Sequence, residues 1–327
     1  MRWRAWVGGA WVASLAALSA CSNSERAPAN GQAHLQIGLD LRAGYYPALL
    51  ADKLGYFRDE GVNVDLTLPE DTDQLLVDFA AGSLDGVAVA LGDTINVIDA
   101  NPDVHIVLFS DLSDGADMVL ALPPILRPED LRGKAVGTNV GGFGELLVRH
   151  MLDDHGVPAA EVKLLNVDAA QAVDRLMSGE LAAVHTWEPY ASRARALGAR
   201  VLYTSHDADG LVLDSFMFAG ATLRAHPEAV RSFVRAWFRA EDHWQAHRSA
   251  DDLLIQKRLA SPAAIEHAGI HLLTPAEEKL AFQAGPTNRS ARHVLQEFVE
   301  FFVSRGNLSA DPDLDQVLDA RFLPDTK

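Results

Sequence analysis

Hydrophobic positions along the chain fall into two patterns that alternate. Short, nearly continuous apolar runs indicate buried β-strands, and apolar residues spaced three or four apart indicate helices with one buried face. Strands are predicted at 35–39, 62–68, 87–91, 106–109, 119–122, 135–138, 162–165 and 183–186. Helices are predicted between them, for example one that ends at Gly55 and one that ends at Gly82. This alternation predicts an α/β protein with parallel sheets and helices on both faces.

The same order of elements occurs twice along the chain. Segments 62–93 and 162–188 each run from a strand through a helix and a Gly-containing turn to a second strand. Gly82 and Gly179 occupy matching places, and each suits the left-handed position that ends a helix. We therefore predict two similar α/β lobes joined by a hinge that the chain crosses twice. The predicted boundaries are 34–112 with 214–327 for lobe 1, and 113–213 for lobe 2.

After Ser215 the apolar pattern becomes helical. Apolar and aromatic residues recur at helical spacing from Val230 to Trp244 and from Val294 to Phe302. An aromatic stripe of this kind is typical of a buried helix face rather than of a cofactor site. The C-terminal helices are predicted to pack on lobe 1, to which the chain returns near 213–219.

The first 21 residues have the features of an export signal. Arg2 and Arg4 precede an apolar run at 5–17 that is too short to span a bilayer comfortably, followed by Leu-Ser-Ala-Cys at 18–21. This tetrapeptide resembles a bacterial lipobox, which implies a signal peptide at 1–20, cleavage before Cys21 and lipidation of its thiol. A plain signal peptide with an incidental cysteine is the alternative. Residues 21–33, rich in Ser, Pro, Gly and Asn, are predicted to form a flexible tether to a bacterial membrane, facing the periplasm or the cell exterior.

Composition excludes several classes of protein. The 327 residues are 48% hydrophobic, which is enough for a large core and excludes disorder for most of the chain. The 28 basic and 45 acidic residues give a net charge of −17. Without Arg2 and Arg4 the charge is 26 − 45 = −19, which argues against nonspecific nucleic-acid binding. The single cysteine excludes an internal disulfide and a Cys-based zinc site.

Searches for catalytic motifs find no match. The chain has no Gly-x-Ser-x-Gly elbow, no Gly-x-x-x-x-Gly-Lys-Ser/Thr loop, and no Gly-x-Gly-x-x-Gly after its first strand. His243 and His247 have the spacing of metal ligands on a helix, but no Glu follows His243 as it does in zinc proteases. Solvent-facing histidines are therefore favoured. No metal, no cofactor and no catalytic residue is predicted.

Polar and aromatic residues gather where predicted strands lead into helices. In open α/β sheets ligands bind beyond the carboxyl ends of strands, near helix N-termini. The candidate ligand-binding residues are Tyr45, Tyr46, Asp93, Thr94, Asp114, Gly142, Phe143, Trp187, Glu188 and Asp214. Each has a structural alternative: the aspartates as helix caps, the tyrosines as packing residues, and the tryptophan as a wedge at the hinge.

Five short motifs carry a resemblance to a known family. They are Gly-Tyr-Tyr-Pro at 44–47, Leu-Gly-Tyr-Phe-Arg-Asp-Glu-Gly-Val-Asn-Val at 54–64, Ala-Gly-Ser-Leu-Asp at 81–85, Asp-Leu-Arg-Gly-Lys at 130–134 and Trp-Glu-Pro at 187–189. Their order and spacing over about 36–238 resemble substrate-binding proteins of the ABC importers for nitrate, sulfonate, taurine and thiamine precursors. The resemblance implies the type II periplasmic-binding fold, whose two lobes close around a small-molecule solute, with an ABC permease and ATPase as partners. We expect a monomer.

Charge suggests a class of solute. The candidate cleft contains Arg42 as its one base against six acids: Asp93, Asp114, Asp117, Glu145, Glu188 and Asp214. At 5 Å and an effective dielectric near 20, one like-charge contact costs about 3 kcal/mol, more than a helix N-terminus returns to an anion. This disfavours bare sulfonate or nitrate. It favours a nitrogen-containing solute such as an aminopyrimidine, a urea-like amide or an amine, and taurine remains compatible because it carries both charges.

Three alternatives to transport remain at this point. A ligand-sensing lipoprotein that signals to a receptor kinase or chemoreceptor would have the same sequence features. A pyrimidine-synthesising enzyme family shares the fold, but it relies on a cysteine-rich iron motif that a chain with one cysteine cannot supply. A purely structural lipoprotein would not need a cleft between two lobes.

Overall fold

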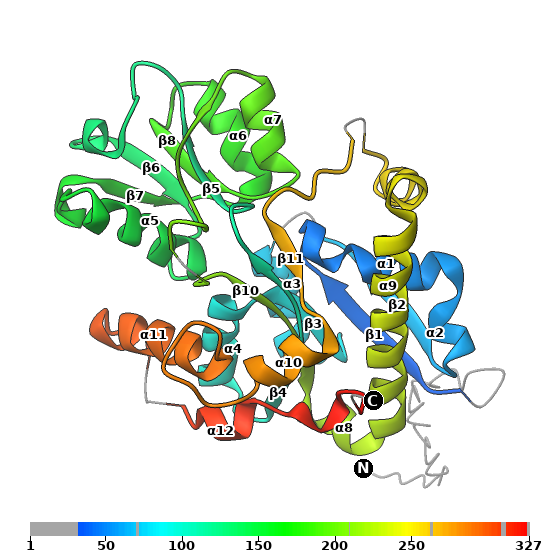
Figure 1. Cartoon of the computed structure of the whole chain (residues 1–327). Coiled ribbons are helices and arrows are strands. Elements are labelled where there is room, and N and C mark those ends of the chain that lie inside the picture. The colour runs from blue at the N-terminus through cyan, green and yellow to red at the C-terminus, as the bar shows by residue number, and fades with distance from the viewer. Residues whose placement is uncertain (1–31, 70–71, 209, 262–263, 309–311, 326–327) are drawn as a thin grey trace, which may run out of the picture. The chain divides into compact units, whose positions relative to one another are not determined.

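The computed structural model describes residues 32–69, 72–208, 210–261, 264–308 and 312–325. Residues from Gln32 onward form one compact unit. The predicted signal peptide, Cys21 and nearly all of the predicted tether therefore lie outside the described residues. In the described part, strands form two sheets with helices packed against them (Figure 1).

The first sheet has six strands in the order β11-β4-β10-β3-β1-β2. Their bounds are His34–Leu39 (β1), Asn63–Thr67 (β2), Gly86–Ala90 (β3), Val104–Ser113 (β4), Leu213–Ala219 (β10) and Ile270–Leu272 (β11). Strand β1 pairs in parallel with β2 and β3, so that Ile37 stands opposite Leu66 and Gly86. Strand β10 lies antiparallel between β3 and β4, and β11 lies antiparallel to β4.

The second sheet has five strands in the order β7-β6-β8-β5-β9. Their bounds are Met118–Ala121 (β5), Ala135–Thr138 (β6), Lys163–Asn166 (β7), Ala183–Thr186 (β8) and Arg200–Thr204 (β9). Strand β6 is parallel to β7 and β8, whereas β5 is antiparallel to β8 and β9.

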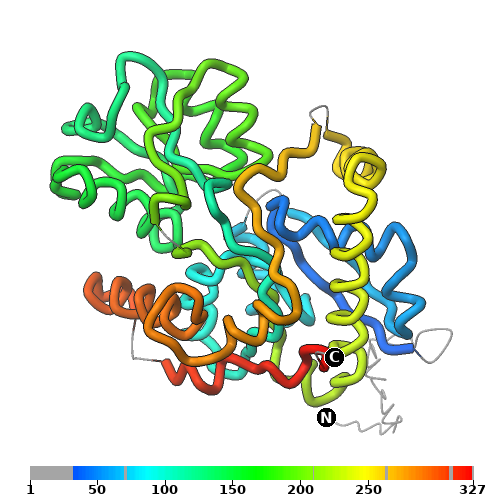
Figure 2. The backbone as a smooth tube through the Cα atoms, viewed as in Figure 1, coloured from blue at the N-terminus to red at the C-terminus, as the bar shows by residue number. Residues whose placement is uncertain are grey.

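The expectation of purely parallel sheets is wrong for the strands next to the crossings. A helix between two strands returns the chain to the same end of the sheet, which makes the strands parallel. Strands β5 and β10 instead enter their sheets directly from the other sheet, through residues 114–117 and 205–212, and so run against their neighbours. Figure 2 shows these two passages of the chain between the sheets. The sequence analysis also missed strands β9 and β11.

The boundaries predicted for the two lobes, 34–112 with 214–327 and 113–213, stay a prediction.

The other strands and the repeat of elements lie where the pattern placed them. The unit β2–α3–β3 recurs as β7–α6–β8, where α3 spans Thr72–Ala80 and α6 spans Ala169–Met177. Gly82 and Gly179 follow these helices with φ of 75° and 78°, a conformation that L side chains rarely adopt. A Cβ at either glycine would meet nothing within 4 Å, so the requirement is conformational and not steric.

The remaining helices cover the two sheets. On the first sheet and its edges lie α1 (Tyr46–Leu54), α2 (Tyr56–Asp59), α4 (Thr94–Ala100), α8 (Gly220–Ala225), α9 (Pro227–Arg258), α10 (Pro275–Ala281), α11 (Ala291–Ser304) and α12 (Leu314–Val317). On the second lie α5 (Phe143–Asp154) and α7 (Tyr190–Ala196). Short 3-10 turns are η1 (Ala43–Tyr45), η2 (Leu91–Asp93), η3 (Pro128–Leu131), η4 (Ala159–Glu161) and η5 (Ala320–Phe322).

The predicted C-terminal helices are confirmed as α9 and α11. Phe233 and Trp237 of α9 are fully buried, with ring centroids 5.3 and 5.0 Å from that of Phe216 on β10. Burying such a side chain stabilises the fold by about 1.5–3 kcal/mol. Helix α11 packs on α4 and also contacts α5 of the second sheet. Among the described residues, no helix combines the length and apolar character needed to cross a membrane.

Candidate functional site

The two crossing segments are hydrogen-bonded to each other. Ser113 Oγ and Ser205 Oγ are 2.8 Å apart, and the Ser205 amide donates to the carbonyl of Asp117 at 2.9 Å. The Ser113 amide donates to the carbonyl of Val212 at 2.9 Å. Ser113 and Ser205 are both buried. The hydrogen bonds between the two crossings are therefore shielded from water. A rotation of one sheet against the other has to bend both crossings together.

Arg42 lies where the two crossings meet, a place we call the seam, and pairs with Asp117 of the first crossing and with Asp214 at the start of β10. It follows β1, and its Nε donates to Asp214 Oδ2 at 2.7 Å while Nη2 donates to Asp117 Oδ2 at 2.8 Å. Side-chain exposures of Arg42, Asp117 and Asp214 are 4%, 0% and 1%. The guanidinium group faces the ring of Trp187 at 4.7 Å and that of Phe143 at 5.1 Å, both from the second sheet and its helices. We call these five residues the Arg42 cluster.

The charges in the cluster are set by burial and by Arg42. Burial alone would raise the pKa of Asp117, but Arg42 and His185 lower it to about 2. Burial raises the pKa of Asp214, and the attraction of Arg42 offsets only part of that effect. Burial likewise raises the pKa of Asp40 to about 6 and that of Asp93 to about 7. The seam is therefore less negative at neutral pH than a count of its carboxyl groups indicates.

Two further contacts join the sheets next to Arg42. Trp187 Nε1 donates to the carbonyl of Leu41 at 3.0 Å, and the amide of Phe143 donates to Asp93 Oδ1 at 3.0 Å. A Cβ on Gly142 would lie 2.4 Å from Asp93 Oδ1, so the chain needs glycine there to approach the carboxylate. Asp93, for which an N-cap of its own helix was the structural alternative, makes no such cap and instead accepts from the amide of Phe143, the first residue of α5.

The structure brings some of the predicted site residues together and separates others. Asp93, Gly142, Phe143, Trp187 and Asp214 meet around Arg42, and Tyr45 lies beside them with its ring edge against Phe216.

The other predicted residues have different surroundings. Thr94 Oγ1 donates to the carbonyl of Leu91 within its own turn. Tyr46 packs against Trp244 and, with Glu188, lines a surface pocket of about 190 Å³. Asp114 is 56% exposed and pairs with His206.

The six acids counted in the sequence do not face one cleft. Asp117 and Asp214 contact Arg42, whereas Glu145 pairs with Arg149 at 2.8 Å and with Arg305. Glu188 accepts from the amide of Ser192 at 3.1 Å and so caps the start of α7. Counting charges along the sequence overstated the negative charge at the seam because it could not show which acids already have partners.

The seam has buried polar atoms without hydrogen-bond partners among the described residues. They are Arg42 Nη1, Tyr45 Oη, Asp117 Oδ1, His185 Nε2, Thr186 Oγ1 and Asp214 Oδ1. His185 Nε2 and Asp117 Oδ1 are 3.6 Å apart, too far for a hydrogen bond. Native proteins contain a few such atoms per hundred residues, and six of them within one small region are a local excess that a bound polar molecule would explain.

The free space beside these atoms is small. A cavity lined by Arg42, Gly44, Asp111, Trp187 and Asp214, among others, has about 10 Å³ of space. That volume holds about one water molecule. A solute enters this place only when the sheets move apart or a side chain turns away.

Sequence reasoning missed several members of the site. His185 and Thr186 were predicted only as the end of a strand, although the rule that ligands bind beyond strand ends applied to them as to Trp187. Arg42 and Asp117 were placed in the candidate cleft by their charges but were not predicted as ligand-binding residues. Their pairing has no local signal, because Arg42 and Asp214 are 172 residues apart in the chain.

Comparison with known proteins places this geometry in context. Residues 43–249, more than half of the chain, match the family model described as NMT1/THI5 like. A curated relative, "Putative binding protein YtlA" of Bacillus subtilis (strain 168), is 24% identical over 217 residues, which are 64% of this chain and 65% of the relative. The chain thus matches less than two thirds of the length of that relative.

Two solved structures have the same fold. The periplasmic aliphatic sulphonate binding protein SsuA from Escherichia coli matches with a TM-score of 0.70 and 18% identity, over 87% of this chain and 96% of SsuA. The periplasmic nitrate-binding protein NrtA from Synechocystis PCC 6803 matches with a TM-score of 0.71 and 14% identity, over 88% and 86%. The predicted type II periplasmic-binding fold is confirmed, and the chain belongs to the NMT1/THI5-like family.

Proposed function

We propose that the protein is the solute-binding component of an ABC-type importer and that it holds a small, polar, nitrogen-containing solute at the Arg42 cluster. The observation that carries this proposal is the group of six buried, unpartnered polar atoms at the seam between the sheets. The family match and the fold of sulfonate- and nitrate-binding proteins support a binding role rather than catalysis.

The unpartnered atoms define the chemistry of the solute. Asp117 Oδ1 and Asp214 Oδ1 accept hydrogen bonds, and Arg42 Nη1 donates one. A solute that fits them carries N–H donors together with an acceptor, as an aminopyrimidine, a urea-like amide or an amine with a polar tail does. The rings of Trp187 and Phe143 offer flat faces for stacking. Taurine also fits, because its ammonium group matches the carboxylates and its sulfonate matches Arg42.

Binding is coupled to movement of the two sheets. The solute contacts Arg42 on one side and Trp187 and Phe143 on the other, so it favours the arrangement in which both sides meet. An ABC permease and its ATPase are the proposed partners that recognise this arrangement. The export signal and the lipid on Cys21 remain part of the proposal, and they place the binding unit at a bacterial membrane surface.

Thermal unfolding in the presence of candidate solutes tests the proposal. An aminopyrimidine, urea, a primary amine, taurine and an ethanesulfonate cover the chemical alternatives. A solute at 100 times its dissociation constant stabilises the folded protein by about 2.7 kcal/mol. Trp187→Ala and Asp93→Ala are expected to remain folded and to lose this stabilisation, whereas Arg224→Ala, an exposed arginine paired with Asp103, keeps it.

Two results would contradict the proposal. Stabilisation by ethanesulfonate alone would show that the solute is a plain anion. Full stabilisation in both Trp187→Ala and Asp93→Ala would place the solute elsewhere.

A further inference from the structure

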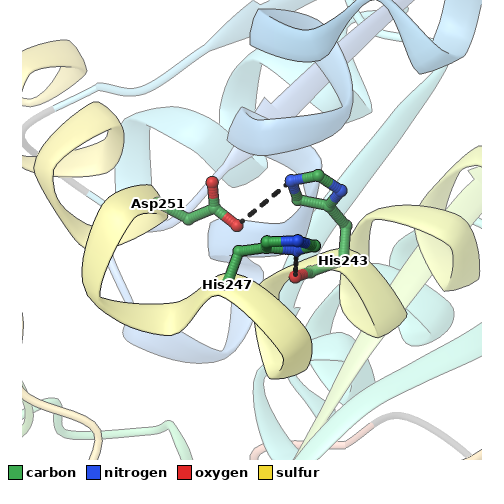
Figure 3. Close-up of side chains that lie close together, drawn as sticks. All are labelled: His243, His247 and Asp251. Atoms are coloured by element: carbon green, nitrogen blue, oxygen red, sulfur yellow. Dashed lines mark hydrogen bonds and ion pairs between the residues drawn. The ribbon is translucent and has the colours of Figure 1, made fainter.

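Helix α9 contains a kink at which three side chains with metal-binding groups gather. His247 has φ of −126° and ψ of 24°, outside the helical range, within the helix Pro227–Arg258. His243, His247 and Asp251 each offer one ligand atom, and these atoms all lie within 4.8 Å of one another (Figure 3). We call these three residues the kink cluster. None of them is part of the Arg42 cluster.

The buried carboxylate of Asp251 points into the kink cluster. Asp251 is 3% exposed, and its Oδ2 has no hydrogen-bond partner in the part of the chain that the structure describes. The same oxygen lies 3.5 Å from His243 Nε2. Two ligands of a tetrahedral zinc ion, each about 2.0–2.1 Å from the metal, are about 3.4 Å apart. One edge of a zinc coordination shell is thus already present.

Each imidazole ring has a hydrogen-bond partner on its Nδ1 atom. His247 Nδ1 lies 3.0 Å from the carbonyl oxygen of His243. A carbonyl only accepts, so Nδ1 carries the proton and the neutral ring keeps Nε2 free for a metal. His243 Nδ1 lies 2.9 Å from Tyr56 Oη, and the Tyr56 ring is in turn covered by Arg239 at 3.9 Å. Partners of this kind on the second ring nitrogen are typical of metal-binding histidines.

The kink explains how three residues at this spacing meet. In a straight helix His243 and Asp251, eight positions apart, would be about 12 Å apart along the axis. The kink at His247 brings their side chains together, as Figure 3 shows. A bound ion would therefore hold α9 in its bent form.

We infer that the kink cluster binds a divalent transition-metal ion, with zinc as the best match. Two imidazoles and one carboxylate suit zinc and its neighbours in the first transition row better than calcium or magnesium, which prefer oxygen ligands. Three protein ligands leave one coordination position for water. This inference does not depend on the proposed solute site.

Zinc titration of the full chain tests the inference. All samples are prepared without a histidine tag, carry Cys21→Ser so that the thiol binds no metal, and are freed of metal with a chelator. Calorimetry is expected to show one zinc ion per chain and thermal unfolding a higher melting temperature with zinc. Asp251→Asn and His247→Gln are each expected to weaken zinc binding at least about tenfold, the scale found when metal-site residues are altered.

The matched control is His271→Gln. His271 is an exposed histidine that pairs with one carboxylate, Glu277, at 2.9 Å, and its loss is expected to leave zinc affinity unchanged. His247 is exposed, so His247→Gln tests the site even where Asp251→Asn lowers stability. The inference is overturned if the Cys21→Ser parent binds no zinc, or if His247→Gln binds zinc as tightly as His271→Gln does.

Discussion

The Arg42 cluster and the contact between α5 and α11 both join the first sheet to the second, and they differ in how much water reaches them. At the Arg42 cluster every charged side chain is buried. At the contact between α5 and α11, His150 and Glu297 pair at 2.9 Å with exposures of 35% and 31%. Glu145 of α5, which is itself buried, also pairs there with Arg305, which is 32% exposed and lies just after α11.

The difference shows why similar ion pairs contribute unequally to the stability of the fold. An exposed pair is screened by water and contributes about 0–1 kcal/mol, whereas removing one partner of a buried pair leaves a charge without solvation. Removing a charge at the Arg42 cluster is therefore expected to destabilise the fold more than removing one at the partly exposed contact, whose contribution also depends on pH and salt.

Arg42→Ala is expected to have the largest effect. It leaves Asp117 and Asp214 buried without their cation, which costs about 3–5 kcal/mol of the free energy of unfolding. Chemical denaturation measures this loss. The control Arg224→Ala removes an exposed arginine that holds Asp103 through both oxygens, and it is expected to cost about 1 kcal/mol or less. An equal loss of unfolding free energy in the two variants would show that the burial of Arg42 does not increase its contribution to stability.

Asp93→Asn is expected to change how stability depends on pH. Burial raises the pKa of Asp93 to about 7, so between about pH 4 and 7 the folded protein keeps a proton that the unfolded chain has lost. The contribution of Asp93 to stability is present in full below about pH 4 and is lost as the pH rises through 7.

Asparagine has no such proton but still accepts from the amide of Phe143. The free energy of unfolding of Asp93→Asn should therefore fall less steeply between pH 5 and 7, by as much as about 1.4 kcal/mol per pH unit. Denaturant unfolding of both proteins across this range measures the slopes. Parallel slopes would show that Asp93 is ionised in the folded protein.

Glu297→Gln is expected to have the smallest effect. The hydrogen bond that His150 donates to Glu297 raises the pKa of His150. This pair therefore stabilises the fold at pH values below the ordinary histidine pKa and loses its effect as the pH rises through the raised value. The variant should lose less than about 1 kcal/mol at pH 6 and nothing measurable at pH 9. NMR titration of His150 should show its pKa fall. An unchanged pKa of His150 would show that Glu297 does not stabilise the protonated imidazole.

Local features of the fold followed from the sequence, and long-range pairing did not. Continuous apolar runs located strands such as β6, and Gly82 and Gly179 marked helix ends, because these signals depend on neighbouring residues. The antiparallel direction of β10 depends on the route of the chain between the sheets, which no local pattern records.

The two candidate sites show the same limit. Trp187 was predicted from its position after a strand and Asp214 from its place at the return of the chain to lobe 1. The role of Arg42 depends on contacts with residues far away in the chain. His243 and His247 were noticed by their spacing and assigned to solvent. Asp251, eight positions beyond His243, joins them only because the helix bends, and helical spacing assumes a straight helix.

The place of Trp187 gives the protein an optical reporter. Of its six tryptophans, Trp3, Trp6 and Trp11 belong to the predicted signal peptide. Trp237 and Trp244 are fully buried within the first sheet and its helices, and their surroundings stay intact when the sheets part. Trp187 alone lies at the seam, stacked on Arg42 and 5% exposed. In a chain that lacks residues 1–20, a shift in tryptophan fluorescence would therefore report a change at the seam, without any added label.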